Sequence, residues 1–202
     1  IRGALAAAAL SAGICPSPAV ARARESGLTA DERARLLAGG TVDREVSMPQ
    51  GSGFGLVAYR LVRASPAEVL SVLADAGQWP ELLPRTKSAR VLWRASDIQS
   101  VQLVQGNGLV EASYAVRVER QAGGLRFWLD RGRPHDIDAV WGYFRASPFD
   151  AERTLLTMAV MLDLGGGLLQ GLVEGRVRQA IVSTPARIQG FVEPRAVAFA
   201  GE

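Results

Sequence analysis

The sequence is poor in the residues that most often carry chemistry. Its 202 residues include one cysteine and one histidine, and Lys87 is its single lysine. One cysteine, Cys15, cannot form an internal disulfide, and one imidazole falls short of the ligand sets that hold catalytic zinc. A serine triad would need His135 as its base, and the chain has no G-x-S-x-G motif. Triad hydrolysis is therefore not expected.

The histidine is also a weak metal-site candidate. His135 stands beside Asp136 and Asp138 in a segment that contains glycine and proline. One imidazole with carboxylates at strand spacing is a poor ligand set, so we interpret His135 as a polar hairpin residue and expect no metal and no cofactor. Carboxylates on or beside strands could act as acid or base inside a cavity, although solvated positions are the simpler interpretation. They are Glu111, Asp130, Asp136, Asp138 and Asp163.

Charge of neither sign dominates the chain. The 23 basic and 20 acidic residues leave a formal net charge of +3 and are interleaved without a run of one sign. This pattern is typical of a solvated surface, so no nucleic-acid partner is expected. Hydrophobic residues make up 48% and charged residues 21%, which fits one globular domain of this length.

The first residues differ from the rest. A charged residue at position 2 precedes an alanine-rich apolar run over 3–14, and small-x-small sites end at Ala21 and Ala23. This order predicts a signal peptide over 1–23, cleaved after Ala21 or Ala23, and export to the periplasm or cell envelope. The run is too short to span a bilayer. An amphipathic or disordered N-terminus is the alternative, and the missing Met suggests a truncated start or another start codon.

Local signals predict three short helices. Capping boxes at Thr29 and Ser65 begin two of them, and glycines at 39–40 and at Gly77 are expected to end them. The segment 79–84 has a proline near each end, which fits one further helical turn.

A series of strands follows, with turn residues between them. An earlier strand region over 43–63 contains the glycine cluster 51–55, and we interpret this cluster as a turn or bulge because no helix start follows it. The later strands are predicted over 89–95, 98–105, 109–120, 125–131, 137–147 and 153–164.

The chain ends in a long helical pattern. Apolar residues recur every three or four positions from Leu169 to Phe191, and Pro185 should kink the helix. Gly171 and Gly175 each cost roughly 1 kcal/mol relative to alanine in a helix. Either the backbone packs closely on the sheet there, or the missing side chains leave room for a ligand.

The order of these elements predicts an α+β fold. A curved antiparallel sheet of about six to seven strands would wrap around the C-terminal helix, which is the one large element able to cover its apolar face. The expected division is a signal peptide over 1–23, an N-terminal helical extension over 24–42, a domain over 43–194 and a tail over 195–202.

The chain resembles the START-like helix-grip superfamily (SRPBCC) over roughly 28–192. Residues 65–75 look like the family's first helix, and 78–84 (QWPELLP) look like its W/Y-P-E-F-x-P turn. Residues 141–144, with 153–155 after them, are similar to its late hairpin. The family includes polyketide cyclases, coenzyme Q-binding proteins and lipid-transfer domains. The resemblance therefore implies a cavity for a lipid, sterol, quinone or polyketide.

Alternation along the strands suggests which side chains face such a cavity. Phe127 is expected inside and Trp128 outside or near the mouth, whereas Trp141 and Tyr143 are expected inside because they share parity with Ile137. Core packing is the alternative for each aromatic residue. The candidates for the cavity lining are Trp79, Tyr114, Phe127, Leu129, Trp141, Tyr143, Leu169, Val173, Val177 and Ile181. No catalytic residue is assigned.

Together these features favour a non-catalytic binder or carrier of an apolar small molecule in the cell envelope, such as a lipid, hopanoid, quinone or polyketide-like compound. Contact with a membrane surface during ligand exchange is left open. A cyclase or aromatase that uses the same cavity is one alternative. A partner-binding module with a closed core is the other.

Overall fold

The structure is a computed structural model that describes residues 27–47, 53–106, 110–165 and 170–200, with side chains at 170–173 and 197–200 outside the description. In these residues eight strands form one open antiparallel sheet in the order β1-β2-β8-β7-β6-β5-β4-β3. The strands are β1 (Val42–Val46), β2 (Phe54–Val62), β3 (Thr86–Ala95), β4 (Ile98–Gly106), β5 (Glu111–Gln121), β6 (Gly124–Leu129), β7 (Ala139–Pro148) and β8 (Thr154–Asp163). The helices are α2 (Ala30–Leu37), α3 (Pro66–Ala74), the 3₁₀ turn η1 (Ala76–Gln78), α4 (Trp79–Leu82) and α5 (Gln170–Ala200).

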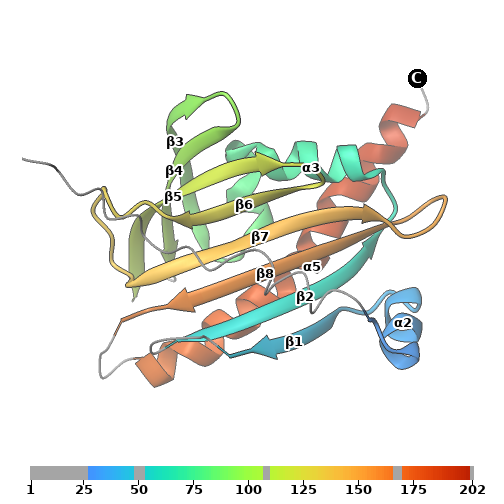
Figure 1. Cartoon of the computed structure of the whole chain (residues 1–202), viewed down its shortest axis with the longest axis horizontal. Helices are drawn as coiled ribbons and strands as arrows, with labels where there is room; N and C mark the ends of the chain where they lie inside the picture. Colours follow the sequence, from blue (N-terminus) through green and yellow to red (C-terminus); the bar gives the residue numbers. More distant parts are fainter. Residues whose placement is uncertain (1–26, 48–52, 107–109, 166–169, 201–202) are drawn as a thin grey trace, which may run out of the picture.

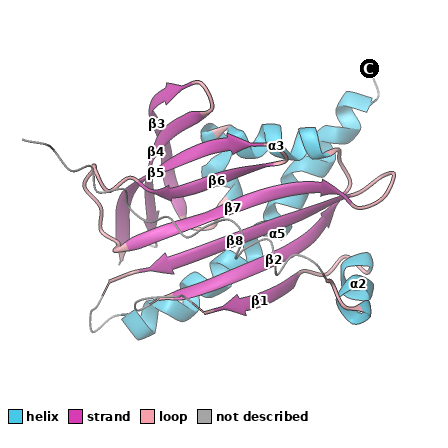
Figure 2. Cartoon of the chain, in the orientation of Figure 1, coloured by secondary structure: helices cyan, strands magenta, loops and turns pink. Residues whose placement is uncertain are grey.

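The helices lie on both faces of a bent sheet. Figure 1 shows β3, β4 and β5 running steeply across the direction of β2, β7 and β8, with α5 behind β2 and β8. Helices α3 and α4 lie on the same side as α5, whereas α2 stands near β1 and β2 (Figure 2). The predicted helix-grip architecture is therefore confirmed, with the long helix held in the bend.

The capping signals begin helices where the sequence predicts them. Thr29 and Glu32 form a capping box at α2, and Ser65 and Glu68 form one at α3. One detail differs, since α3 ends at Ala74 and not at the glycine expected to close it. The carboxylate of the extended Asp75 accepts the Gly77 N–H at 2.9 Å and starts the 3₁₀ turn instead.

The meander is confirmed, with one correction to the number of strands. Six strands match the predicted segments from 89 to 164 to within a few residues. The glycine cluster separates two strands, because β1 pairs antiparallel with β2 from Val42↔Tyr59 to Val46↔Gly55. The described sheet thus has eight strands, whereas about six to seven were expected. Residues 51 and 52 of the cluster lie outside the described residues.

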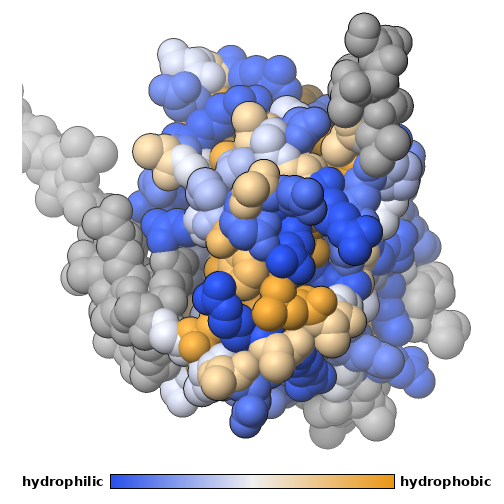
Figure 3. Space-filling model, turned by 90° about the vertical axis from the view of Figure 1, so that its right-hand side faces the viewer, coloured by the Kyte–Doolittle hydropathy of each residue, from blue (hydrophilic) through white to orange (hydrophobic). Residues whose placement is uncertain are grey.

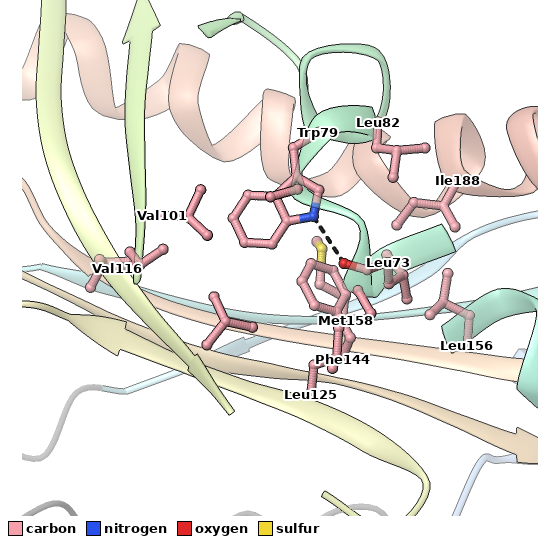
Figure 4. Packing of buried hydrophobic residues seen from close by; sticks show 14 of the residues in the cluster. Leu73, Trp79, Leu82, Val101, Val116, Leu125, Phe144, Leu156, Met158 and Ile188 are labelled. Carbon is pink, nitrogen blue, oxygen red and sulfur yellow. Dashed lines mark hydrogen bonds between the residues drawn. The ribbon is translucent and has the colours of Figure 1, made fainter. Parts of the chain in front are cut away.

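The core has two parts because β2 is buried on both faces. Leu56 and Ala58 belong to the main cluster between the sheet and helices α3, α4 and α5. Val57 and Tyr59 belong to a smaller cluster with Leu36 of α2 on the opposite face. Each large aliphatic side chain fully buried in such clusters contributes about 1.5–3 kcal/mol to folding. The main cluster, part of which Figure 4 shows, anchors α5 across the sheet.

Helix α5 is longer than expected. It continues through Pro185 and through 195–200, which were expected as part of a tail. Its Gly175 is exposed, and a Cβ added there would have no neighbour within 4 Å, so close packing on the sheet does not explain that glycine. Within the described residues, no helix combines the length and apolar character needed to cross a membrane.

Candidate functional site

A cavity of about 580 Å³ lies between the concave face of the sheet and helices α4 and α5. Most of its wall is apolar and comes from β4 to β8 and from the two helices. The apolar lining residues include Trp79, Leu83, Leu103, Val116, Phe127, Val140, Phe144, Met158, Val160, Leu162, Val177 and Ile181. A space of this size and character is typical of sites for small apolar ligands.

Half of the predicted lining candidates meet in this cavity. These five are Trp79, Tyr114, Phe127, Val177 and Ile181. Leu129 is 6% exposed and belongs to the main core cluster, but it does not line the cavity. Leu169 and the side chain of Val173 lie outside the described residues. Whether the five residues contact a ligand stays a prediction.

The placement of Trp141 and Tyr143 in the lining is wrong. In β7 the cavity wall contains Val140 and Phe144, so the odd-numbered side chains point to the opposite face, where Tyr143 packs against the α2 cluster. The prediction took its parity from Ile137, which does line the cavity. However, Ile137 precedes the first residue of β7, and strand alternation does not extend into the preceding loop.

The neighbouring strand β6 follows the predicted alternation. Phe127 lines the cavity, whereas Trp128 pairs across the strands with Trp141 and carries the Arg126 guanidinium 4.8 Å from its ring centroid. The ring centroids of Phe127 and Phe144 are 5.6 Å apart, with the planes tilted by 40°. The two phenylalanines therefore form one aromatic part of the wall.

A glycine makes room for this aromatic pair. Gly142 lies directly opposite Phe127 in the β6–β7 register. A Cβ on Gly142 would lie 2.6 Å from Phe127 Cζ and 2.0 Å from the Ala159 carbonyl oxygen, and both distances are too short. The sequence reasoning did not select this residue. Its signal was a glycine inside an otherwise β-prone segment, which often marks a close approach of another group.

Trp79 presents an apolar ring because its polar atom is already paired. Its indole N–H donates to the Leu73 carbonyl oxygen at 2.9 Å, across the turn that joins α3 to α4 (Figure 4). The side chain is 4% exposed. The hydrogen bond fixes the ring orientation and leaves only carbon surface for the cavity.

Two neighbouring polar side chains interrupt the apolar wall. The Tyr114 hydroxyl donates to Gln105 Oε1, and Gln105 Nε2 donates to Thr86 Oγ1 at 2.8 Å. Burial raises the pKa of the Tyr114 phenol well above its usual value, so the group stays neutral at physiological pH. A further lining hydroxyl, that of Thr184, donates to the Ala180 carbonyl oxygen of its own helix at 3.0 Å.

Charged and exposed residues gather where the cavity opens. The exposed lining residues are Arg85, Val110, Glu111, Asp136 and Arg176. Glu111 pairs with Lys87, and Asp136 accepts the Ser113 N–H at 2.8 Å. We call this set of exposed lining residues the mouth. Figure 3 views the opposite end of the molecule, near α2, where apolar residues form a group among hydrophilic ones.

His135, which was interpreted as a polar hairpin residue, does not line the cavity. The residue is exposed, and its Nδ1 lies 2.8 Å from the Ile137 carbonyl oxygen, which fits a polar residue of the loop before β7. In the described part of the chain, no group of three or more histidine, cysteine, aspartate or glutamate side chains is arranged to hold a metal ion.

Comparisons with known proteins agree with this geometry. A family model described as polyketide cyclase/dehydrase and lipid transport matches residues 62–184. Human StAR-related lipid transfer protein 5 has a TM-score of 0.64 and 13% identity, over 87% of this chain and 94% of that chain. A STAR-related lipid transfer protein from Xanthomonas axonopodis has a TM-score of 0.60 and 18% identity, over 78% and 90%.

An aromatase/cyclase is also similar. The Zhui aromatase/cyclase from Streptomyces sp. R1128 has a TM-score of 0.57 and 17% identity, over 77% of this chain and 94% of that chain. At such identities these structures show a shared fold alone. No curated protein matches the chain.

Proposed function

Because this chain belongs to the polyketide cyclase/dehydrase and lipid transport family, we propose that it binds and carries one apolar small molecule in the cavity under its sheet. The membership also confirms the START-like resemblance of the motifs at 65–84. The observation that carries the proposal is the apolar space of about 580 Å³. Ligands of suitable character include lipids, hopanoids, quinones and polyketide-like compounds.

The size of the cavity limits the ligand. At about 30 Å³ for each water-sized group, the space holds roughly 20 non-hydrogen atoms. Burial of roughly 300 Å² of apolar ligand surface at about 25 cal/mol/Å² would supply about 7.5 kcal/mol before the costs of ordering are subtracted. Affinity is therefore expected on the order of micromolar or weaker for a plain hydrocarbon.

The test is uptake of an uncharged fluorescent probe. Pyrene emission should change on titration with the purified protein, and Ala180→Phe should weaken binding at least tenfold because Ala180 lines the cavity. Gln179→Phe is the matched control, since its site is exposed and outside the lining. Equal binding by wild type and both variants would show that the probe sits elsewhere. A wild-type protein that takes up no pyrene would contradict the proposal.

We also propose that carriage takes place in the cell envelope. The support is the signal-peptide pattern over 1–23, which lies outside the described residues. The precursor should appear in the envelope or periplasmic fraction of its host, shortened after Ala21 or Ala23. A precursor that stays uncleaved in the cytosolic fraction would count against this location.

A cyclase or aromatase is the second candidate function. The support is the hydrogen-bonding pair Gln105 and Tyr114 inside an apolar cavity, where it could orient the carbonyl groups of a polyketide chain. Mass spectrometry of the ligand before and after incubation separates the two functions. A carrier returns its ligand unchanged, whereas a cyclase returns it with loss of water.

A further inference from the structure

The polar pair in the cavity is built across three strands. Thr86 of β3 lies directly opposite Gln105 of β4, and Tyr114 of β5 lies diagonally from Gln105, opposite Leu103. Cross-strand neighbours on one face of a sheet are close enough to hydrogen-bond. The two hydrogen bonds run in one direction, from Tyr114 to Gln105 to Thr86. The strands therefore hold Gln105 and Tyr114 in place before any ligand arrives.

Gln105 and Tyr114 retain hydrogen-bonding groups in the cavity wall after these two bonds are made. The Tyr114 O–H is used as a donor, so its oxygen can still accept. Gln105 uses one N–H on Thr86 and one lone pair for Tyr114, so it retains one N–H donor and one acceptor lone pair. Among the described residues, no other side-chain hydrogen bond uses this remaining capacity. A group that both donates and accepts would complement the pair.

The pair lies just inside the mouth. Glu111 stands at the mouth where β5 begins, and Tyr114 lies three residues further along the same strand. The Tyr114 hydroxyl reaches back to Gln105, which pairs with Ala112 beside Glu111 and with Thr86 beside Arg85, so the two polar groups meet just inside the mouth. Beyond them the wall is carbon from residues such as Phe144 and Met158, both of which are 6% exposed or less.

We propose that the ligand carries one uncharged hydroxyl group that binds between Gln105 and Tyr114, with its apolar body extending past them towards Phe144 and Met158. This inference rests on the proposed carriage of an apolar molecule and names the class of that molecule. The class is a compact alcohol or phenol with a single chain or ring system. Two long acyl chains would not fit in about 580 Å³.

Amphiphiles with a charged head group are poorer ligands for this neutral pair of side chains. A carboxylate or ammonium group bound between Gln105 and Tyr114 would exchange part of its hydration for the neutral groups of this pair, which is unfavourable. The cavity's own charged residues Arg85, Glu111, Asp136 and Arg176 lie at the mouth. A bare hydrocarbon is also a poor complement, because it would cover Gln105 and Tyr114 without pairing their remaining atoms.

Four related probes test the inference on the wild-type protein. They are pyrene, 1-hydroxypyrene, 1-methoxypyrene and the anion 1-pyrenecarboxylate, titrated by fluorescence at pH 7. We expect 1-hydroxypyrene to bind roughly tenfold more tightly than pyrene, as one or two net hydrogen bonds would provide. The methoxy compound, which cannot donate, should fall between them. The anion should bind more weakly than 1-hydroxypyrene.

Variants test whether Gln105 and Tyr114 cause the preference for a hydroxyl-bearing probe. Tyr114→Phe and Gln105→Met should each reduce the hydroxyl preference, which is the ratio of 1-hydroxypyrene affinity to pyrene affinity, and the double variant should abolish it. Gln102→Met is the matched control for Gln105→Met, because Gln102 belongs to the same strand, lies outside the cavity lining and donates to Ser113 Oγ at 2.9 Å. It should leave the preference unchanged. Thermal melting of each variant checks its folding, and the wild-type probe series needs no variant.

The outcomes separate the two proposals. Uptake of all uncharged probes with equal affinity would overturn the hydroxyl inference and leave the carrier function standing. Tighter binding of 1-pyrenecarboxylate than of 1-hydroxypyrene would overturn it in favour of recognition by the cations at the mouth. Uptake of none of the four probes would overturn the carrier function and this inference with it.

Discussion

Replacement of Gly142 by alanine tests how the sheet makes room for the aromatic wall. The added Cβ would lie 2.0 Å from the Ala159 carbonyl oxygen and 2.6 Å from Phe127 Cζ, whereas ordinary contacts begin near 3.4 Å. Strand β7 would have to move away from β8 by about 1 Å or more, against the ladder that pairs the two strands from Ala139 to Pro148. Overpacking of this kind costs about 1–3 kcal/mol.

The assay is urea unfolding, followed by fluorescence and circular dichroism. Gly142→Ala should lower the free energy of unfolding by about 2 kcal/mol, and pyrene should bind more weakly because the Phe127 ring is displaced. Gly175→Ala is the control. A Cβ there meets no atom within 4 Å, so helix propensity should stabilise that variant by up to about 1 kcal/mol. A Gly142→Ala protein as stable as wild type would refute the close-approach argument.

Three further changes follow from the structure. Trp79→Phe removes the donor to the Leu73 carbonyl oxygen and should cost about 1–3 kcal/mol in urea unfolding, more than Trp93→Phe on the other face of the sheet. Ser65→Ala removes the α3 cap and should cost about 1 kcal/mol, whereas Ser71→Ala on the exposed side of the same helix should change stability by less than half of that. The hydrogen bond from Arg44, with that from the Thr29 N–H, lowers the pKa of Glu32 from 4.5 to about 2. A carboxylate with a lowered folded-state pKa adds stability above pH 4.5 that is lost as the pH falls towards 2, so the melting temperatures of wild type and Glu32→Gln should converge over that range. A constant difference between them would contradict the assignment.

Local signals in the sequence predict most of the fold. The capping boxes at Thr29 and Ser65 need only neighbouring residues, and both begin helices where predicted. The meander follows from alternation and turn residues, which are also local. The glycine cluster at 51–55 was harder, because glycine permits both a bulge and a turn, and only the pairing of β1 with β2 decides between them.

The cavity wall depends on information that a local pattern does not hold. The face of β7 was assigned wrongly because Ile137, from which the parity was taken, lies in the loop before the strand, where alternation does not apply. The contact of Gln105 with Thr86 and Tyr114 requires the register of three strands. Gly142 likewise becomes informative only once Phe127 is known to lie opposite it. For Gln105 and Gly142 the missing information was the pairing between strands, and for β7 it was the residue at which the strand begins.

The same contacts explain why the space does not collapse. Trp79 and Thr184 satisfy their polar donors within the protein, so neither side chain must turn into the cavity to find a partner. Small residues at Gly142 and Ala180 keep bulk away from the bend of the sheet, which the long helix α5 then holds open through its packing on β2 and β8. A wall fixed in this way is preformed, and a ligand that enters it loses little free energy to reorganisation of the protein. Affinity should therefore follow the match between ligand and wall, and the unpaired capacity at Gln105 and Tyr114 is where that match becomes selective.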